Sequence, residues 1–387
     1  MRMLFTFVGG RGHFEPLAPI ARLATAAGHS IAFGCATSML PAVEAEGLPA
    51  VPIGSEPGRS PERLPLQPLD SEREERDLRE RFVQRAARYR VPLAIALCEE
   101  WRPDVVVCDE TDFGVMIAAE RLGLPYATVQ VIAAGSFVRP EVVGDVLQAL
   151  RSEHGLPPDA RLEMLSRYLV LSPVPPSFRD PTVPLPNTAH SLRPSSGSDE
   201  FMRPAAAGQP TRTPTVYFTL GTIFNLESGD LFSRVLAGLR ELSIQLVVTV
   251  GQGIDPAEFG SQPANVRIEQ YIPQSQVLPG CDLVVSHAGS GSVIGALAHG
   301  LPSLLIPMGA DQPENARRCV ELGVGTALDA LSASAADVRE AASELLVDAS
   351  YRRNAERIRD EIAALPDLGR AVELLEELAI EKQPLHA

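Results

Sequence analysis

The residues best suited to chemistry lie where a histidine and several small residues follow an apolar run. Residues 282–292 read Asp-Leu-Val-Val-Ser-His-Ala-Gly-Ser-Gly-Ser. This pattern predicts a strand, a tight turn and a helix that begins near Ser290. Backbone N–H groups and the positive end of the helix dipole would favour an anion there, most naturally a diphosphate. The same pattern also fits an ordinary βα turn with a packed histidine. The candidate phosphate ligands are the side chain of His287 and the backbone donors of Gly289, Ser290, Gly291 and Ser292.

This stretch and the residues after it resemble the donor motif of family 1 glycosyltransferases, especially bacterial natural-product enzymes that use nucleoside-diphosphate sugars. The family pattern is H-G-G-x-G-T, then E-A-L, G-x-P and D-Q-x-x-N-A. In this chain the pattern stands as His287-Ala-Gly-Ser-Gly-Ser, Gly295-Ala-Leu, Gly300-Leu-Pro and Asp311-Gln-Pro-Glu-Asn-Ala. The resemblance implies an α/β protein of GT-B architecture, with two Rossmann-like doubly wound domains facing a central cleft.

The resemblance also implies further donor contacts. Thr222, in the loop after a strand expected at 215–219, would lie on the phosphate side. Tyr271 and Ile272 would contact the nucleotide base, Ile272 through its backbone. Asp311 and Gln312 would hold sugar hydroxyls.

Three residues depart from the family pattern. Ala288 replaces a glycine and Ser292 replaces a threonine, but both substitutes are small and leave the backbone donors in place. Gly295 stands where many relatives have a glutamate that accepts hydrogen bonds from ribose hydroxyls, including the 2′-OH. A 2′-deoxyribose loses least when that glutamate is absent, so the sequence favours a dTDP-sugar over a UDP-sugar as co-substrate.

A second motif, Gly12-His-Phe-Glu-Pro-Leu, follows the first apolar run and resembles the family's G-H-x-x-P-L. Histidine ordinarily titrates near neutrality and can take the proton of an acceptor hydroxyl, which then attacks an anomeric carbon with inversion. The resemblance implies that His13 is this base and that Asp109 balances its charge, as in a hydrolase triad. We expect a carboxylate oxygen within about 3.2 Å of a His13 ring nitrogen. Glu110 and Asp112 are rival carboxylates, and a turn histidine satisfied by backbone groups is the alternative for His13.

No metal is expected at this site. The chain has no D-x-D, the spacing with which many glycosyltransferases hold a divalent ion on the diphosphate, and no His/Cys cluster with zinc spacing. The leaving diphosphate would then be stabilised by the helix dipole, His287 and hydroxyl groups. No cofactor is expected besides the co-substrate.

The chain has 387 residues, of which 45% are hydrophobic, enough for two domains with large cores. We expect an acceptor-binding domain over 1–195, a Pro- and Ser-rich linker over 196–214 and a donor-binding domain over 215–365. A final helix in 366–387 would cross back to the first domain.

Residues 72–90 are highly charged and predict a solvent-facing helix. Strands of the second domain are expected at 215–219, 246–250, 266–269, 283–286, 303–306 and 325–328.

The net charge of −15 argues against nucleic acid and anionic membranes as partners. The expected partners are a nucleotide-sugar donor and a small hydrophobic aglycone; the oligomeric state stays open, a homodimer included. The absence of a signal-peptide pattern and of a long apolar run predicts a cytoplasmic protein. Two alternatives remain open: a nucleotide-sugar epimerase of the same fold, which would release free sugar with no acceptor, and a non-catalytic auxiliary protein.

Overall fold

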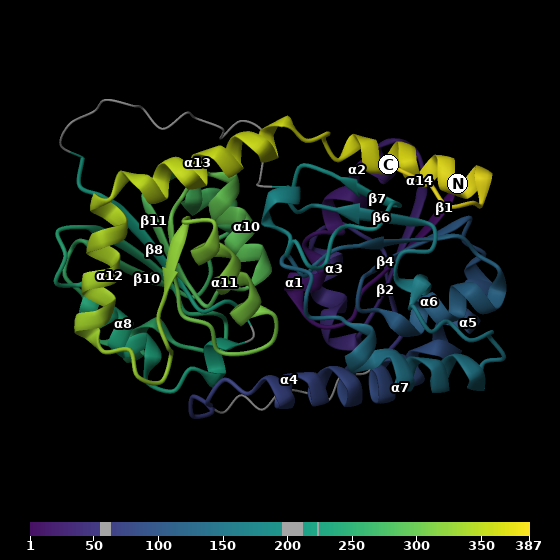
Figure 1. Ribbon diagram of the computed structural model, residues 1–387, viewed down its shortest axis with the longest axis horizontal. Coiled ribbons are helices and arrows are strands. Elements are labelled where there is room, and N and C mark those ends of the chain that lie inside the picture. The colour runs from purple at the N-terminus through teal and green to yellow at the C-terminus, as the bar shows by residue number, and fades with distance from the viewer. Residues whose placement is uncertain (55–62, 196–211, 223) are drawn as a thin grey trace. The chain divides into compact units, whose positions relative to one another are not determined.

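The computed structural model describes residues 1–54, 63–195, 212–222 and 224–387, which fall into two compact units (Figure 1). The described part of the first unit comprises residues 1–54, 70–193 and 365–387. That of the second comprises residues 63–69, 194–195, 212–222 and 224–364. Of the linker expected at 196–214, residues 196–211 lie outside the described part of the chain.

The first unit is built on a parallel sheet of seven strands in the order β3-β2-β1-β4-β5-β6-β7. Its central strands are short apolar runs, as is typical of parallel strands that are covered on both faces. The strands are β1 (Arg2–Thr6), β2 (Ser30–Cys35), β3 (Ala50–Pro52), β4 (Val105–Asp109), β5 (Tyr126–Val129), β6 (Leu169–Ser172) and β7 (Ala189–Ser191).

Helices cover both faces of this sheet. The α-helices are α1 (Arg11–Phe14), α2 (Ala18–Ala26), α3 (Leu40–Ala45), α4 (Ser71–Asp77), α5 (Arg88–Trp101), α6 (Phe113–Leu122), α7 (Pro140–Glu153) and α14 (Gly369–Glu381). A π-helix, η2 (Leu78–Ala87), joins α4 to α5, and short 3₁₀ turns are η1 (Thr37–Met39), η3 (Glu163–Leu165) and η4 (Pro176–Phe178).

Alternate residues of β1 point into two cores, because successive side chains of a strand face opposite sides. Met3 and Phe5 pack with α2, α3 and α14, whereas Leu4 packs with α5 and α6. Figure 1 shows α14, in yellow, beside α2. The last helix of the chain therefore completes a layer of the N-terminal unit.

The second unit has a parallel sheet of six strands in the order β10-β9-β8-β11-β12-β13. Each of its strands matches the expected range to within one residue at either end. They are β8 (Thr215–Thr219), β9 (Gln245–Thr249), β10 (Val266–Glu269), β11 (Leu283–Ser286), β12 (Ser303–Leu305) and β13 (Gly325–Ala327).

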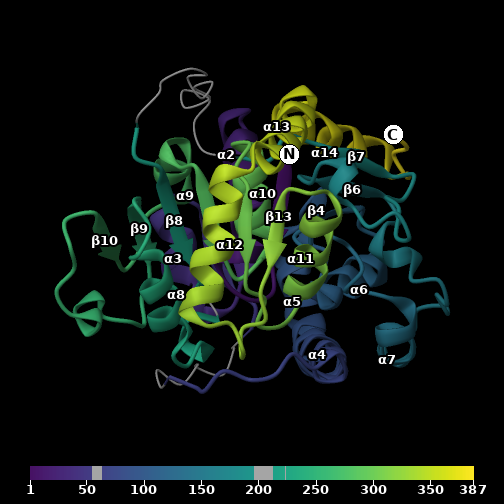
Figure 2. The ribbon, with the colours of Figure 1, turned by 60° about the vertical axis from the view of Figure 1, so that its left-hand side comes forward.

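The helices of the second unit are α8 (Leu231–Leu239), α9 (Gln274–Val277), α10 (Ser290–Ala298), α11 (Gln312–Glu321), α12 (Ala335–Val347) and α13 (Ala349–Ala364). Short 3₁₀ turns are η6 (Phe224–Glu227), η7 (Pro256–Phe259) and η8 (Leu278–Gly280). Helices α8 and α12 lie side by side, as both views show, and bury Val235 and Val338 in one core (Figure 2).

The segment 72–90 differs from the solvent-facing helix that its charge predicts. It spans α4, η2 and the start of α5, and Leu78, Val83 and Ala87 are buried in the core of the first unit. Arg90 is only 4% exposed. The charge pattern misled because three buried apolar positions among many charged ones suffice to bury one face, and because Arg90 finds a buried carboxylate, as described below.

In both sheets the strand order reverses direction near the middle, between β1 and β4 in the first sheet and between β8 and β11 in the second. In the first, β1 leads outward through β2 and β3, and β4 then starts the other half; in the second, β8 leads to β9 and β10 before β11. Loops diverge at such a switch point and leave a crevice at the carboxyl ends of the strands, where α/β proteins bind ligands. His13 comes after β1, and Asp109 is the last residue of β4. In the second unit, Thr222 comes after β8 and His287 comes after β11.

Candidate active site

His13 lies on the single-turn helix α1, directly after β1. The turn before it passes through Gly9, whose φ of 94° is in the region that glycine adopts most easily. A Cβ atom at Gly9 would also stand 3.1 Å from Cδ2 of His13. Glycine at this position therefore serves both the bend and the room for the imidazole ring. The side chain of His13 is 22% exposed, so it is held by its surroundings and still reachable.

Asp109 is the last residue of β4 and is fully buried. Its Oδ1 accepts hydrogen bonds from the backbone N and the hydroxyl of Thr111, at 2.6 and 2.5 Å, and its Oδ2 accepts one from the backbone N of Val8 at 2.6 Å. Burial raises the pKa of the Asp109 carboxyl, but His13 and these hydrogen bonds more than offset it, so the pKa lies below its ordinary value. Asp109 is therefore an ionised carboxylate at neutral pH.

The structure brings His13 and Asp109 together because β1 and β4 pair in register. Nδ1 of His13 lies 3.5 Å from Oδ2 of Asp109 and 3.4 Å from the hydroxyl of Thr111. The carboxylate distance exceeds the expected 3.2 Å, and three other donors, two from Thr111 and one from Val8, already bind the carboxylate of Asp109. Hydrogen bonds at catalytic sites are often long without substrate and shorten when it binds. Sequence reasoning missed Thr111, although a hydroxyl residue two positions after an aspartate commonly forms such a local turn.

The two rival carboxylates are engaged elsewhere. Oε1 of Glu110 accepts hydrogen bonds from the backbone N of Val131 and of Ile132, each at 2.7 Å. Asp112 forms a buried ion pair with Arg90, with N–O distances of 3.0 and 2.6 Å, and its side chain caps α6. Asp109 is thus the carboxylate that the structure places at His13.

Two further residues that the sequence did not single out lie around this turn. The guanidinium of Arg90 donates to the backbone oxygen of Phe7 at 3.1 Å and to that of Ile53 at 3.2 Å, and thereby ties α5 to the carboxyl ends of β1 and β3. The ring of Phe82, from η2, stacks on that of His13 with centroids 6.5 Å apart. A π-helical stretch shifts the register of the residues it carries, and such stretches are frequent at functional sites.

In the second unit, His287 lies directly after β11 and is 9% exposed. Burial lowers its pKa to about 4, so the ring is neutral at pH 7. Its Nδ1 is buried and, among the described residues, meets no hydrogen-bonding partner. A buried polar atom of this kind is costly unless a ligand satisfies it.

Two glycines leave room for the imidazole ring of His287. A Cβ atom at Gly221 would lie 2.6 Å from Nε2 of His287, and one at Gly289 would lie 2.5 Å from the same atom. Helix α10 begins after Gly289, an N-cap residue that has no side chain of its own to cap the helix. The first N–H groups of α10, including those of Ser290, Gly291 and Ser292, are thus placed to bind an anion. Thr222, next to Gly221, is exposed.

The two residues expected to hold sugar hydroxyls lie at the start of α11. Oδ2 of Asp311 accepts hydrogen bonds from the hydroxyl of Ser290 at 2.6 Å and from Nδ2 of Asn315 at 2.8 Å. Gln312 is 2% exposed, and its Oε1 accepts from the backbone N of Met308 at 2.8 Å. Any contact of Gln312 with a sugar oxygen would therefore have to come from its amide nitrogen.

The expected base-binding residues precede α9. Tyr271 is exposed and Ile272 is partly buried. On α9 itself, Nε2 of Gln274 donates to the hydroxyl of Ser292 at 3.1 Å. A Cβ atom at Gly295 would stand 3.0 Å from Oε1 of Gln274. Gln274 thus occupies part of the space that a longer side chain at position 295 would need.

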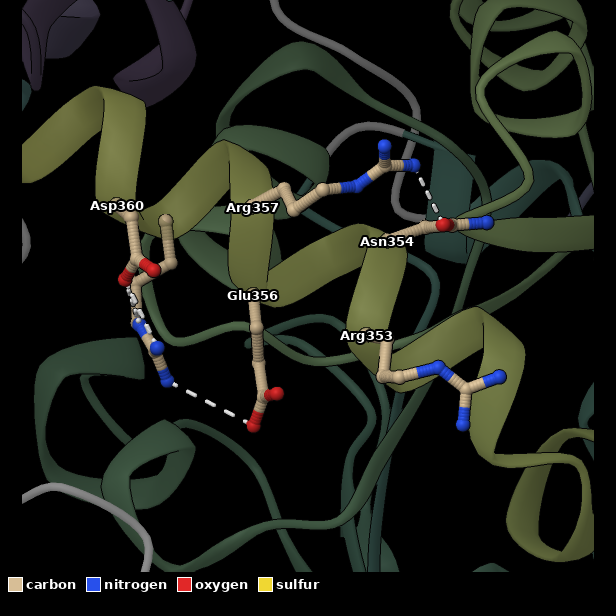
Figure 3. Close-up of a pocket in the computed structure, with 6 residues that line it drawn as sticks. Arg353, Asn354, Glu356, Arg357 and Asp360 are labelled. Carbon is tan, nitrogen blue, oxygen red and sulfur yellow. Dashed lines mark hydrogen bonds and ion pairs between the residues drawn. The ribbon is translucent and has the colours of Figure 1, made fainter.

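A separate surface hollow lies on α13, away from these residues. It is lined by Arg353, Asn354, Glu356, Arg357, Arg359 and Asp360 (Figure 3). Arg357 donates to Asn354 at 2.6 Å, and Arg359 pairs with Asp360 at 2.8 Å. A hollow lined by the residues of a single helix offers little enclosure for a ligand.

Within the described part of the chain, no group of three or more His, Cys, Asp or Glu side chains is arranged to hold a metal ion. The five cysteines are buried and unpaired with one another. None of the helices that the structure describes combines the length and apolar character needed to span a bilayer.

Comparison with known proteins gives one family match and many full-length relatives. Residues 233–378 match the family described as "Erythromycin biosynthesis protein CIII-like, C-terminal domain". The chain is 29% identical to 4'-demethylrebeccamycin synthase of Lentzea aerocolonigenes, over 97% of this chain and 99% of that protein. It is 28% identical to tylactone mycaminosyltransferase of Streptomyces fradiae, over 98% and 92% of the two chains. The relatives are bacterial antibiotic glycosyltransferases.

Solved structures share the fold over nearly the whole chain. The spinosyn rhamnosyltransferase SpnG complexed with thymidine diphosphate is 23% identical, with a TM-score of 0.78 over 97% of this chain and 100% of that one. The glycosyltransferase VinC in complex with dTDP is also 23% identical, with a TM-score of 0.74 over 98% and 100%. The prediction of two Rossmann-like units of GT-B type is confirmed.

Proposed function

We propose that this chain, whose residues 233–378 belong to the erythromycin biosynthesis protein CIII-like C-terminal domain family, transfers a sugar from a dTDP-sugar to a hydroxyl of a natural-product aglycone. The proposal rests on the side chains that lie at the switch point of each sheet. One holds a histidine beside a buried carboxylate, and the other holds a neutral histidine at the N-terminus of a helix whose N-cap residue is a glycine. The first arrangement is suited to a general base and the second to a diphosphate.

The proposed reaction is a single displacement. His13 takes the proton of the acceptor hydroxyl on Nε2, because its Nδ1 faces Asp109. The oxygen then forms a bond to the anomeric carbon, while the bond from that carbon to the diphosphate breaks and dTDP leaves with the electron pair. Displacement from the opposite side inverts the anomeric configuration. Asp109 stabilises the imidazolium that forms on His13.

The charge that develops on the leaving diphosphate would be stabilised in the second unit. A neutral imidazole still carries one N–H, so His287 can donate to a phosphate oxygen without being protonated. The N–H groups at the start of α10 and the hydroxyl of Ser292 would supply further donors. Asp311 and Gln312 would bind sugar hydroxyls, and Tyr271 and Ile272 the base.

A turnover assay tests the proposal. A panel of dTDP- and UDP-sugars is incubated with polyketide and aromatic aglycones, and glycosides are detected by mass spectrometry with and without each acceptor. We expect acceptor-dependent release of dTDP and a glycoside of inverted configuration. Free sugar formed without acceptor would support an epimerase instead, and dTDP binding without any turnover would support an auxiliary protein. The names of the relatives, a synthase and a sugar transferase, do not favour the epimerase.

Activity should not depend on a divalent metal. The reason is that backbone N–H groups, a helix dipole and His287 would stabilise the charge of the leaving diphosphate without a metal ion. The initial rate is measured before and after treatment with EDTA, and again after addition of magnesium or manganese. We expect all three rates to agree. A rate that EDTA abolishes and magnesium restores would contradict the proposal.

The donor base preference should depend on Gly295. Calorimetric titration of the parent protein should show dTDP bound roughly tenfold more tightly than UDP. A glutamate in Gly295→Glu could accept a bond from the ribose 2′-OH and should shift the preference towards UDP by about tenfold. Its side chain must displace that of Gln274, which stands 3.0 Å from the new Cβ atom.

Gly295→Ala is the matched control for this prediction, because it introduces the same Cβ atom without a carboxylate. The ratio of the dTDP and UDP affinities should stay at the parent value in Gly295→Ala. Equal affinities for the two nucleotides in the parent protein, or tighter binding of UDP, would refute the dTDP assignment.

A further inference from the structure

The turn between β11 and α10 contains an unusual backbone conformation. Ala288 is fully buried and has a φ of 67°, in the left-handed region that disfavours residues with a Cβ atom. The residue lies between His287 and Gly289, so its conformation sets the direction in which the chain enters α10. The backbone N–H of Ala288 donates to the hydroxyl of Ser286 at 3.3 Å, and a contact to its carbonyl from outside the turn would further hold this strained conformation.

Asn315 of α11 makes the contact that can do so. Its side chain is fully buried, and its Nδ2 lies 3.0 Å from the backbone oxygen of Ala288. The same nitrogen lies 3.1 Å from the hydroxyl of Ser290 and 2.8 Å from Oδ2 of Asp311. The hydroxyl of Ser290 in turn donates to Asp311 at 2.6 Å. One amide group therefore bridges the carbonyl of Ala288, the first residue of α10 and the N-cap residue of α11, Asp311.

We infer that Asn315 is a positioning residue for the diphosphate turn. By holding the carbonyl of Ala288 and the hydroxyl of Ser290, it keeps the N–H groups at the start of α10 converging on one point. The inference rests on the proposed function, since it assigns those N–H groups to a diphosphate. It also couples Asp311, expected at the sugar, to the phosphate turn, because one oxygen of Asp311 belongs to the same network.

The structure contains a natural control for this contact. Nδ2 of Asn354 donates to the backbone oxygen of Gly323 at 2.9 Å, and Gly323 has a φ of 62°. The contact is the same, but a glycine occupies the left-handed position. Asn354 lies on α13, outside the donor turn. Loss of its side chain should lower the thermal midpoint without weakening dTDP binding.

The test is a double-mutant cycle of Asn315→Ala and Ala288→Gly, with dTDP affinity measured by calorimetry. Asn315→Ala should weaken dTDP binding about tenfold, the value of one or two hydrogen bonds. Ala288→Gly alone should change the affinity less than about twofold. The double variant should recover most of the lost affinity, because glycine no longer needs the hydrogen bond to stay left-handed.

A ligand-free measurement separates this inference from the proposed function. Hydrogen exchange of the peptide that covers residues 287–293 should be faster in Asn315→Ala, return towards the parent rate in the double variant and stay unchanged in Asn354→Ala. If the parent protein binds no nucleotide but the variants show these exchange rates, the proposed function fails and the positioning role of Asn315 stands. Affinity and exchange at parent values in Asn315→Ala, or losses that Ala288→Gly does not rescue, would overturn the inference.

Discussion

Replacing His13 by alanine should lower kcat by a factor of about 10² to 10⁴ with an alcohol acceptor, the usual contribution of a general base. The acceptor hydroxyl would then have to lose its proton to water, and a neutral hydroxyl is a poor nucleophile. Donor affinity should barely change, because the residues proposed to bind dTDP belong to the second unit. The measurements are kcat from steady-state kinetics and the dTDP dissociation constant from calorimetry.

His386→Ala is a suitable control, since His386 is an exposed histidine with no part in the proposed chemistry. It should keep the parent kcat. If His13→Ala turns over an unactivated alcohol at nearly the parent rate, His13 is not the base. If it loses dTDP affinity to the same extent as kcat, its role is structural instead.

Asp109→Asn should lower kcat by about 10²-fold or more while the acceptor KM changes little. The neutral amide cannot stabilise the imidazolium that forms on His13, and it no longer fixes which ring nitrogen carries the proton. Its NH₂ group would also meet N–H donors that now bind the carboxylate, those of Val8 and Thr111. We therefore expect a lower thermal midpoint as well, and kcat should be compared at a temperature where the variant is fully folded.

Glu110→Gln provides the matched control for Asp109→Asn. Glu110 is the next residue, and its carboxylate also accepts two backbone hydrogen bonds, from Val131 and Ile132. The same chemical change should disturb the loop after β5 and leave the pH dependence of kcat as in the parent protein. A collapse of kcat in Glu110→Gln, with Asp109→Asn nearly active, would transfer the charge-balancing role to Glu110.

Several parts of the fold follow from local physical rules. Several strands of the second unit, such as β11 and β12, are short apolar runs next to Asp or Pro, and the strand ranges could be predicted to within a residue. The turn after β11 could be predicted as well, because a run of small residues between an apolar strand and a helix is typical of a tight βα turn. The charged segment 72–90 could not, because its burial depends on apolar partners such as Phe113 that lie far away in sequence.

By itself the sequence determined the alternation of strands and helices and the two glycine-rich turns. It also determined that one turn carries a histidine suited to act as a base and that the other carries a histidine and small residues suited to bind a diphosphate. The resemblance implied Asp109 as the partner of His13, and the tertiary structure decided between Asp109 and its two rivals. Asp109, Glu110 and Asp112 are nearly equivalent as sequence, but only Asp109 ends a strand that pairs with β1, whereas Glu110 turns to the loop after β5 and Asp112 to Arg90. It also decided that Asn315, 27 residues from Ala288, holds the left-handed turn. Both outcomes depend on contacts between distant segments, and such contacts form only when parallel strands and their crossover helices are packed together.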